Sequence, residues 1–156
     1  MAKEGIIGFT GSFRENLNEI KQGSKIVFTG SIAVCTPFIE LLSYSVRDKD
    51  YSLIYVPKSE KENAKIIKMR PNIGFSIMDE KADAKNPNVI VVMGGLAMPK
   101  FGCAPEDVLG LIDDISGEQN PKIIGVCFMN IFEKAGWDKK IPFDIILDTT
   151  LETVTK

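Results

Sequence analysis

Two unbroken apolar runs constrain the fold of this chain more than any other feature of its sequence. Residues 89–93 read Val-Ile-Val-Val-Met, and within the expected strand 122–128 the residues that follow Lys122 read Ile-Ile-Gly-Val-Cys-Phe. A strand with one face in water alternates apolar and polar residues, whereas a strand buried on both faces is apolar throughout. Both runs therefore predict central strands of a parallel sheet that helices cover on both sides.

Helical segments separate most of the expected strands along the chain. Strands are expected at residues 25–30, 51–56, 73–78, 89–93, 122–128 and 143–147. Helices are expected at residues 13–22, 37–46, 59–69 and 105–115, with short ones at 79–85 and 130–134. This order predicts a three-layer α/β/α sandwich with a doubly wound, mostly parallel, Rossmann-like sheet of about six strands, in the order 3-2-1-4-5-6.

The length of 156 residues is typical of one domain, so we expect a single Rossmann-like domain over residues 1–156. Residues 1–24 are expected to form a helical extension packed on that domain. Ser12 and Glu15 have the spacing of a capping box, which predicts the helix over residues 13–22. No composition shift or linker divides the chain.

Composition excludes several classes of function. Lys and Arg total 19 and Asp and Glu total 21, so the net charge is −2, and we expect no nucleic-acid partner. Histidine is absent, which excludes His-based catalytic triads and His metal ligands. No apolar run reaches the length of a signal peptide or a membrane span, so we expect no membrane partner. The three cysteines, an odd and small number, indicate reduced thiols and a cytoplasmic location.

The expected binding site lies at the carboxyl edge of the sheet, where open α/β sheets bind ligands at the switch in strand order. The expected first and fourth strands flank this switch, and each is followed by a Cys-x-Pro pattern, at Cys35 and Cys103. The N–H groups of helix N-termini favour a bound anion or a thiolate. The residues that we expect to bind a small anionic ligand, such as a nucleotide or a coenzyme, are Ser31, Thr36, Gly94, Gly95, Lys100 and Asn130.

The loop over residues 94–103 is the most distinctive segment of the chain. It leaves a buried strand with Gly94 and Gly95, which permit a close approach of the backbone to a ligand, and Lys100 is its only cation. The dinucleotide fingerprint is incomplete, because Ile32 stands where its second glycine is required. The sequence therefore names neither a substrate nor a cofactor, and it leaves open whether the protein is an enzyme.

Two alternatives remain open. One is a thiol-dependent enzyme, or a carrier of a metal or cluster, that uses Cys35 and Cys103 with Cys127 as a further ligand. The other is a regulatory or scaffold module without a ligand. Cysteine is often a small apolar filler of protein cores, and that interpretation competes with the first alternative at all three positions.

We also expect a homodimer. The last expected strand, residues 143–147, is apolar and lies at an edge of the sheet, and residues 149–154 keep a composition typical of strands. Exposed sheet edges favour pairing with another chain.

Two segments carry a resemblance to a known family: VFTGSIAVCTPFIELLSYSVRD, at residues 27–48, and VIVVMGGLAMPKFGC, at residues 89–103. They resemble an uncharacterised archaeal family that is found in methanogens and catalogued only as a domain of unknown function. The resemblance spans nearly the whole chain. It implies an archaeal, cytoplasmic setting and assigns no activity and no site residue.

Overall fold

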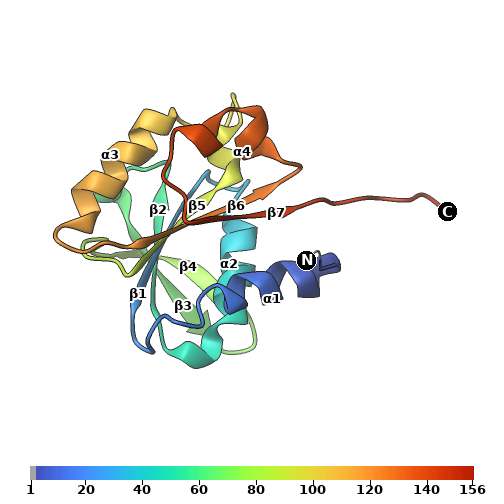
Figure 1. The fold of residues 1–156 in the computed structure, drawn as a ribbon. Coiled ribbons are helices and arrows are strands. Elements are labelled where there is room, and N and C mark those ends of the chain that lie inside the picture. Colours follow the sequence, from blue (N-terminus) through green and yellow to red (C-terminus); the bar gives the residue numbers. More distant parts are fainter. Residues whose placement is uncertain (1–2) are drawn as a thin grey trace.

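The computed structural model of this chain describes residues 3–156 and is built around one seven-stranded sheet (Figure 1). The order of the strands across the sheet is β4-β3-β2-β1-β5-β6-β7. Their bounds are β1 (Lys25–Gly30), β2 (Ser52–Pro57), β3 (Lys65–Arg70), β4 (Gly74–Lys81), β5 (Val89–Met93), β6 (Lys122–Phe128) and β7 (Ile145–Thr149).

The sheet is mostly parallel, as the apolar runs predict. β2, β1, β5, β6 and β7 run in the same direction, and β3 is antiparallel to both of its neighbours. The strands with continuous apolar sequence, β1, β5 and β6, all lie inside the sheet and not at an edge. The switch in strand order falls between β1 and β5, where Val27 pairs with Ile90. The predicted order is confirmed, with one additional strand, β3, inserted.

That additional strand corrects the helix expected over residues 59–69. Only η2 (Lys61–Asn63) is helical there, and β3 follows it. Ser59, the expected cap, lies in the turn that follows β2, with a left-handed backbone of φ 65°. Pairing with β2 outweighs the local helical signal, because it satisfies the backbone groups that β2 would otherwise expose at an edge.

The short helix expected over residues 79–85 is also wrong. β4 continues to Lys81, and its acidic residues pair with lysines across the hairpin: Lys65 with Asp79, at 3.1 Å, and Lys68 with Glu80, at 2.9 Å. Such cross-strand pairs of opposite charge stabilise an antiparallel hairpin. The polar composition of this segment therefore reflects a solvent-facing strand.

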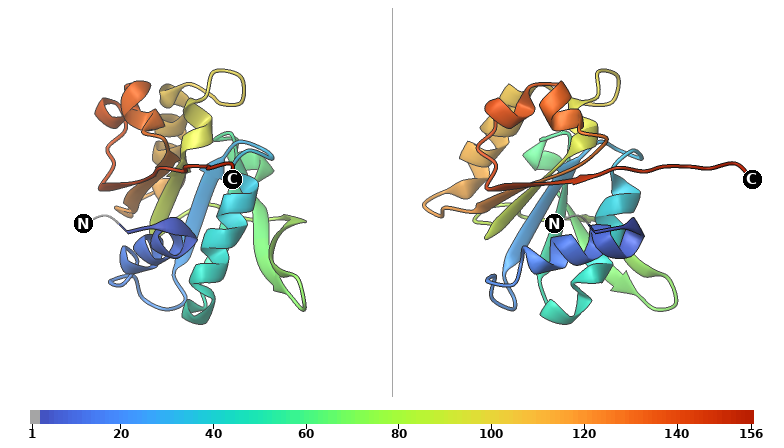
Figure 2. Two further views of the ribbon diagram at one scale, coloured as in Figure 1. Left: turned by 90° about the vertical axis from the view of Figure 1, so that its right-hand side faces the viewer. Right: turned by 45° about the vertical axis from the view of Figure 1, so that its right-hand side comes forward.

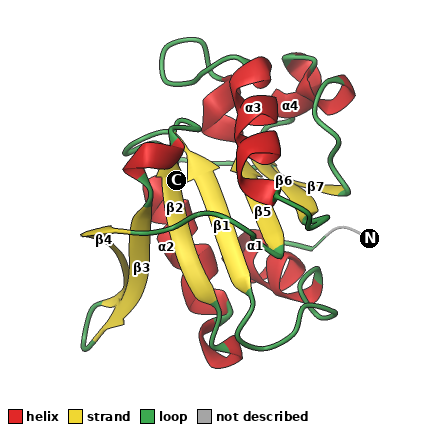
Figure 3. Cartoon of the chain, turned by 90° about the vertical axis from the view of Figure 1, so that its left-hand side faces the viewer, coloured by secondary structure: helices red, strands yellow, loops and turns green. Residues whose placement is uncertain are grey.

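Helices cover both faces of the sheet (Figures 2 and 3). In Figure 3, α3 lies in front of the sheet, while α1 and α2 lie behind it. The α-helices are α1 (Gly5–Glu15), α2 (Thr36–Ser45), α3 (Pro105–Ser116) and α4 (Ile131–Lys134). The remaining short helices are η1 (Arg47–Lys49), η3 (Gly94–Ala97) and η4 (Trp137–Lys139).

The first helix lies earlier in the chain than expected. α1 spans Gly5–Glu15, so Ser12 lies inside the helix and not at its N-cap. Phe9 and Phe13, one turn apart, are buried against the sheet, and their packing holds α1 in place on that face. The apolar residues Leu17 and Ile20 follow in turns, where Tyr51 donates a hydrogen bond to the Ile20 carbonyl over 3.0 Å.

Two apolar cores lie on opposite faces of the sheet. The first packs α1 and α2 against the sheet and contains Phe13, Phe28, Ile39 and Val91. The second packs α3, α4 and η4 against the other face and is centred on Phe132 and neighbouring side chains such as Val92, Leu111 and Trp137. Alternate residues of the buried strands serve the two cores, because successive side chains of a strand point to opposite faces.

After β7 the chain continues as an extended arm, residues 150–156, which projects away from the sheet (Figure 1). Every residue of the arm is exposed. Within the described residues, no helix combines the length and the apolar character that crossing a bilayer requires.

Candidate functional site

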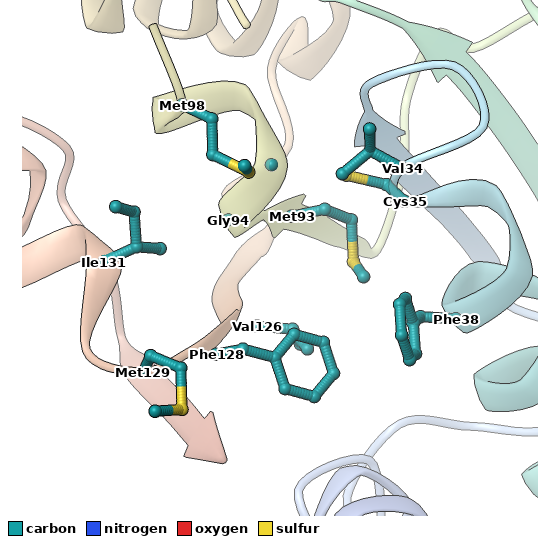
Figure 4. A pocket seen from close by; sticks show the side chains of 11 residues that line it. Val34, Cys35, Phe38, Met93, Gly94, Met98, Val126, Phe128, Met129 and Ile131 are labelled. Carbon is teal, nitrogen blue, oxygen red and sulfur yellow. The ribbon is translucent and has the colours of Figure 1, made fainter. Parts of the chain in front are cut away.

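A cavity of about 310 Å³ opens at the carboxyl ends of β1, β5 and β6 (Figure 4). In Figure 4, Met98, Ile131 and Met129 lie on one side of the cavity, and Val34, Cys35 and Phe38 lie on the other. Its complete lining is Val34, Cys35, Phe38, Met93, Gly94, Gly95, Met98, Val126, Phe128, Met129 and Ile131.

The topology places the cavity at this edge. After β1 the chain turns into α2 on one face of the sheet, and after β5 it turns into η3 and then α3 on the other face. The chain segments that leave neighbouring strands β1 and β5 therefore diverge, and a crevice remains between them. The cavity occupies the switch point that the strand order predicts.

The floor of the cavity is aromatic. The rings of Phe38 and Phe128 have their centroids 4.7 Å apart, and Phe9 of α1 stacks on Phe128 at 5.3 Å. These contacts hold α1, α2 and β6 together beneath the cavity. Planar aromatic pairs of this kind add stability beyond the area that they bury.

The walls of the cavity carry sulfur. Met93 ends β5, Met98 follows η3, and Met129 follows β6, so three thioethers from separate segments line one space. Methionine side chains are flexible and polarisable, and they form favourable contacts with aromatic rings. Every side chain of the lining is uncharged. The chemistry of the site is therefore that of an apolar, adaptable pocket.

Gly94 and Gly95 permit a close approach to the backbone, as expected, but the groups that approach it are side chains of this protein and not a ligand. A Cβ at Gly94 would lie 2.5 Å from Cβ of Cys127 and 2.9 Å from Ile131. A Cβ at Gly95 would crowd the thiol of Cys35. The two glycines therefore let η3 pack onto β6 and onto the start of α2, and this packing forms one wall of the cavity.

Cys35 lies at the N-cap of α2 and is 3% exposed. Burial raises the pKa of its thiol, and the backbone N–H groups of Ser31 and Gly95, which face the sulfur, oppose that rise. The Ser31 hydroxyl is itself buried beside this thiol and forms no hydrogen bond to a nitrogen or oxygen of residues 3–156. Cys35 is thus a protonated thiol at neutral pH, held in the wall of the cavity.

Cys35 and Cys103, which follow the two strands that flank the switch, do not line one cavity. Cys35 belongs to the core on the α1 and α2 face, whereas Cys103 packs against the core on the α3 face. The loop after η3 turns back on itself, with the Cys103 N–H donating to the Leu96 carbonyl over 3.0 Å, and so carries Cys103 away from the cavity. Its sulfur lies 4.0 Å from Oγ of Ser59, and burial raises the pKa of its thiol.

Cys127 is buried in β6, and its thiol donates to Oδ1 of Asp148 on β7 over 3.3 Å. Burial, with the Asp148 carboxylate adding to it, raises the pKa of Cys127 to about 12. Among residues 3–156, no three Cys, Asp or Glu side chains gather closely enough to hold a metal ion. The three-cysteine metal or cluster site considered from the sequence therefore does not form.

The remaining expected ligand residues lie outside the lining. Thr36 is the first residue of α2, and Lys100 is exposed on the loop after η3. Asn130 is the N-cap of the short helix α4, as expected, and its side chain donates to Glu133 over 3.0 Å. Of the residues named in advance, the structure brings Cys35, Gly94 and Gly95 into the cavity, with Ser31 behind them.

Most of the apolar lining was not predicted from the sequence. Phe38 and Ile131 belong to helix starts, and their apolar character alone does not separate them from core residues. One signal was present: Met93 and Met129 both end or follow predicted parallel strands, whose carboxyl ends share one edge.

The fold and the cavity define an α/β protein with an apolar pocket at the switch point of its sheet. Residues 4–152 match a family described as "Uncharacterized protein conserved in archaea (DUF2124)", and the chain belongs to that family.

Relatives in methanogens agree with this assignment. An uncharacterized protein of Methanocaldococcus jannaschii is 41% identical over 124 residues, which are 80% of this chain and 73% of the relative. An uncharacterized protein of Methanothermobacter thermautotrophicus is 33% identical over 148 residues, 95% of this chain and 91% of the relative. A crystal structure of a protein of unknown function from Methanothermobacter thermautotrophicus has a TM-score of 0.88 and 31% identity, covering 100% of this chain and 95% of that one.

Proposed function

We propose that this protein binds a small molecule with an apolar or aromatic body in the cavity at the carboxyl ends of β1, β5 and β6. The observation that carries the proposal is a space of about 310 Å³ with an apolar lining at the switch point of the sheet. Ligand sites in proteins are concave and mostly apolar, and doubly wound sheets form them at this position.

A nucleotide or coenzyme-like ligand, as expected from the sequence, agrees with this proposal only if its charged groups lie outside the cavity. Phosphate groups are held by Lys, Arg or clustered backbone N–H groups, and the lining has no charged side chain. We therefore propose that a ring or another apolar group of the ligand is buried among the methionines, while its charged groups stay at the open mouth. Contacts between thioethers and aromatic rings favour a planar ring in this place.

The proposal is one of binding and not of thiol catalysis. A nucleophilic cysteine reacts as a thiolate, and burial raises the pKa of the Cys35 thiol above its ordinary value. Cys35 and Cys103 also lie on opposite faces, so they do not act as a pair. A cytoplasmic location remains part of the proposal, supported by three cysteines that are all free thiols.

Fluorescent probes test the proposal directly. Anilinonaphthalene sulfonate carries aromatic rings and one negative charge, and N-phenylnaphthylamine is its uncharged counterpart. Both are titrated against the wild-type protein with direct excitation of the probe. We expect both to bind at one site with similar affinity, because the rings and not the charge enter the cavity. Strong binding of the anionic probe alone would instead support an anion site.

Two variants locate the probe. Met98→Trp adds bulk to a side chain that lines the cavity, and Met69→Trp places the same residue at an exposed position of β3. We expect Met98→Trp to weaken the binding of both probes at least tenfold and Met69→Trp to leave it unchanged. Equal binding to both variants, or no binding to the wild type, would overturn the proposal and favour a module without a ligand.

A further inference from the structure

The C-terminal arm, residues 150–156, is an extended chain that no other part of the described structure covers (Figures 1 and 2). It carries two exposed apolar side chains, Leu151 at 52% and Val154 at 70%. The junction between β7 and the arm is tied to the body: the Met129 N–H donates to the Thr149 carbonyl at the end of β7 over 3.0 Å, and the Leu151 N–H donates to Sδ of Met129 over 3.4 Å. The arm thus has a fixed origin and a free backbone.

The strand that precedes the arm is an open edge. β7 is the last strand of the sheet and pairs with β6 on one side. Its sequence, Ile-Ile-Leu-Asp-Thr, contains no proline and no lysine, which are the residues that natural edges commonly use to prevent pairing. The edge and the arm together form one continuous extended segment with unpaired backbone groups.

The neighbouring surface of α1 is apolar at its start. Ile6 is 54% exposed and Ile7 is 86% exposed, and α1 packs beside β7. A groove of about 640 Å³ separates α1 from β7 and the arm, with Gly5 and Gly8 on one wall and Thr150 and Glu152 on the other. Lys3, Phe9 and Ser12 also line the α1 wall, and the backbone of Lys3 covers Gly8.

Strand alternation directs the apolar side chains of the arm. Ile145 and Leu147 pack against the core on the α1 face. Successive side chains of an extended chain point to opposite faces, so Leu151, which shares their parity, lies on the face that α1 covers. An arm from another copy that pairs with β7 would therefore present an apolar side chain on the α1 face of the sheet.

We propose that β7 and the arm pair antiparallel with the same segment of a second copy, so that each subunit lays its arm along the other's edge and α1 groove. A second copy is the occupant because one chain supplies every part: the open edge of β7, the extended arm and the groove beside them. A two-fold axis uses each of these parts twice and closes the assembly. The proposal is independent of the ligand cavity, although the arm is anchored to Met129 in its wall.

Light scattering with size-exclusion chromatography, over a wide range of protein concentration, tests the assembly. We expect the wild-type protein to have twice the chain mass of 17.2 kDa. Two changes in the arm, Leu151→Lys combined with Val154→Lys, and Glu152→Pro, are expected to raise the dimer dissociation constant at least tenfold. The matched control, Ile73→Lys, alters an apolar residue that is 64% exposed in the turn between β3 and β4, and it should leave the dimer intact.

The arm variants are expected to fold like the wild type, because the arm is exposed and makes few contacts within its own subunit. A loss of the dimer in these variants therefore reports on the interface. A monomeric wild type at every concentration overturns the proposal, as does Ile73→Lys weakening the dimer as much as the arm variants do. Hydrogen exchange supplies the second readout. Backbone amides of residues 151–155 should be protected in the dimer and exposed in Glu152→Pro, and a dimer whose arm exchanges freely would exclude arm pairing.

Discussion

Gly95 lies directly against the thiol of Cys35, so closely that a Cβ at position 95 would come nearer than 3.0 Å to the sulfur. The Gly95 N–H also faces that sulfur. This contact joins η3, which follows β5, to the first turn of α2, which follows β1. It therefore links the two chain segments that diverge at the switch point, and it fixes one wall of the cavity.

Gly95→Ala tests this contact. The added methyl group would overlap the Cys35 sulfur and crowd Val34, so we expect the free energy of unfolding to fall by about 1–3 kcal/mol. Combining it with Cys35→Ala should recover part of the loss, because the sulfur that the methyl group meets is removed. Gly110→Ala is the control, since a Cβ there meets no atom within 4 Å in α3, and it should be neutral or stabilising by up to about 1 kcal/mol. Urea denaturation measures all four proteins.

The three thiols should react with iodoacetamide in the order Cys103, Cys35, Cys127. Cys103 is partly exposed, Cys35 is buried but lines an open cavity, and Cys127 is buried in β6 with a pKa raised to about 12. Because the thiolate is the reactive form, both lower access and a higher pKa slow the reaction. Time-resolved alkylation followed by mass spectrometry measures each rate, and early modification of Cys127 would disprove the order.

The ion pair between Arg14 and Asp48 should make stability depend on pH. Arg14 donates to both carboxylate oxygens of Asp48, over 2.5 and 2.8 Å, and to the Ser45 carbonyl over 3.0 Å, so it ties α1 to the end of α2. The guanidinium lowers the pKa of Asp48 below its ordinary value in the folded state. The contribution to stability is therefore present above the ordinary Asp pKa of about 3.9 and is lost as the pH falls below it.

Asp48→Asn should accordingly lower stability at neutral pH, by a small amount because the pair is exposed, and the difference from the wild type should shrink as the pH falls below about 4. Glu62→Gln, at an exposed residue without an ion pair among the described residues, is the control and should show no such difference. Denaturant unfolding at several pH values measures the effect. A constant difference at all pH values would show that the charge of Asp48 is not its cause.

Asp148 should stabilise the turn after β6. Its Oδ1 accepts hydrogen bonds from the Asn130 N–H, over 2.8 Å, and from the Cys127 thiol, and the turn holds Met129 and Asn130 at positive φ. Asp148→Ala removes the acceptor, so we expect the free energy of unfolding to fall by about 1–2 kcal/mol. Asp148→Asn retains an oxygen acceptor and should recover part of that loss.

Asp148→Asn should also lower the pKa of the Cys127 thiol, because the Asp148 carboxylate contributes to raising that pKa. Faster alkylation of Cys127 in Asp148→Asn than in the wild type, at equal pH, measures this change. An exposed helix residue, Asp113, provides the control, and Asp113→Asn should change neither stability nor alkylation.

The sequence by itself determined the centre of the sheet and the position of its switch point. The apolar runs of β5 and β6 admit only strands buried on both faces, and prolines at 37 and 105 mark helix starts because they lack the N–H that a helix interior needs. These signals are local, and each is decided by the residue's own backbone or by its periodicity. They were sufficient to predict a cavity edge and three of its lining residues.

Only the tertiary structure decided the secondary structure of residues 59–69 and the positions of the two Cys-x-Pro cysteines relative to each other. A local helical signal gave way to β3 because the neighbouring edge of β2 required a partner for its backbone. Cys35 and Cys103 have equivalent local sequences, but right-handed crossovers in opposite directions from the switch place α2 and α3 on opposite faces of the sheet. The thiols are separated, and apolar side chains from three strand ends close the cavity, because spatial proximity there depends on handedness and strand order and not on sequence spacing.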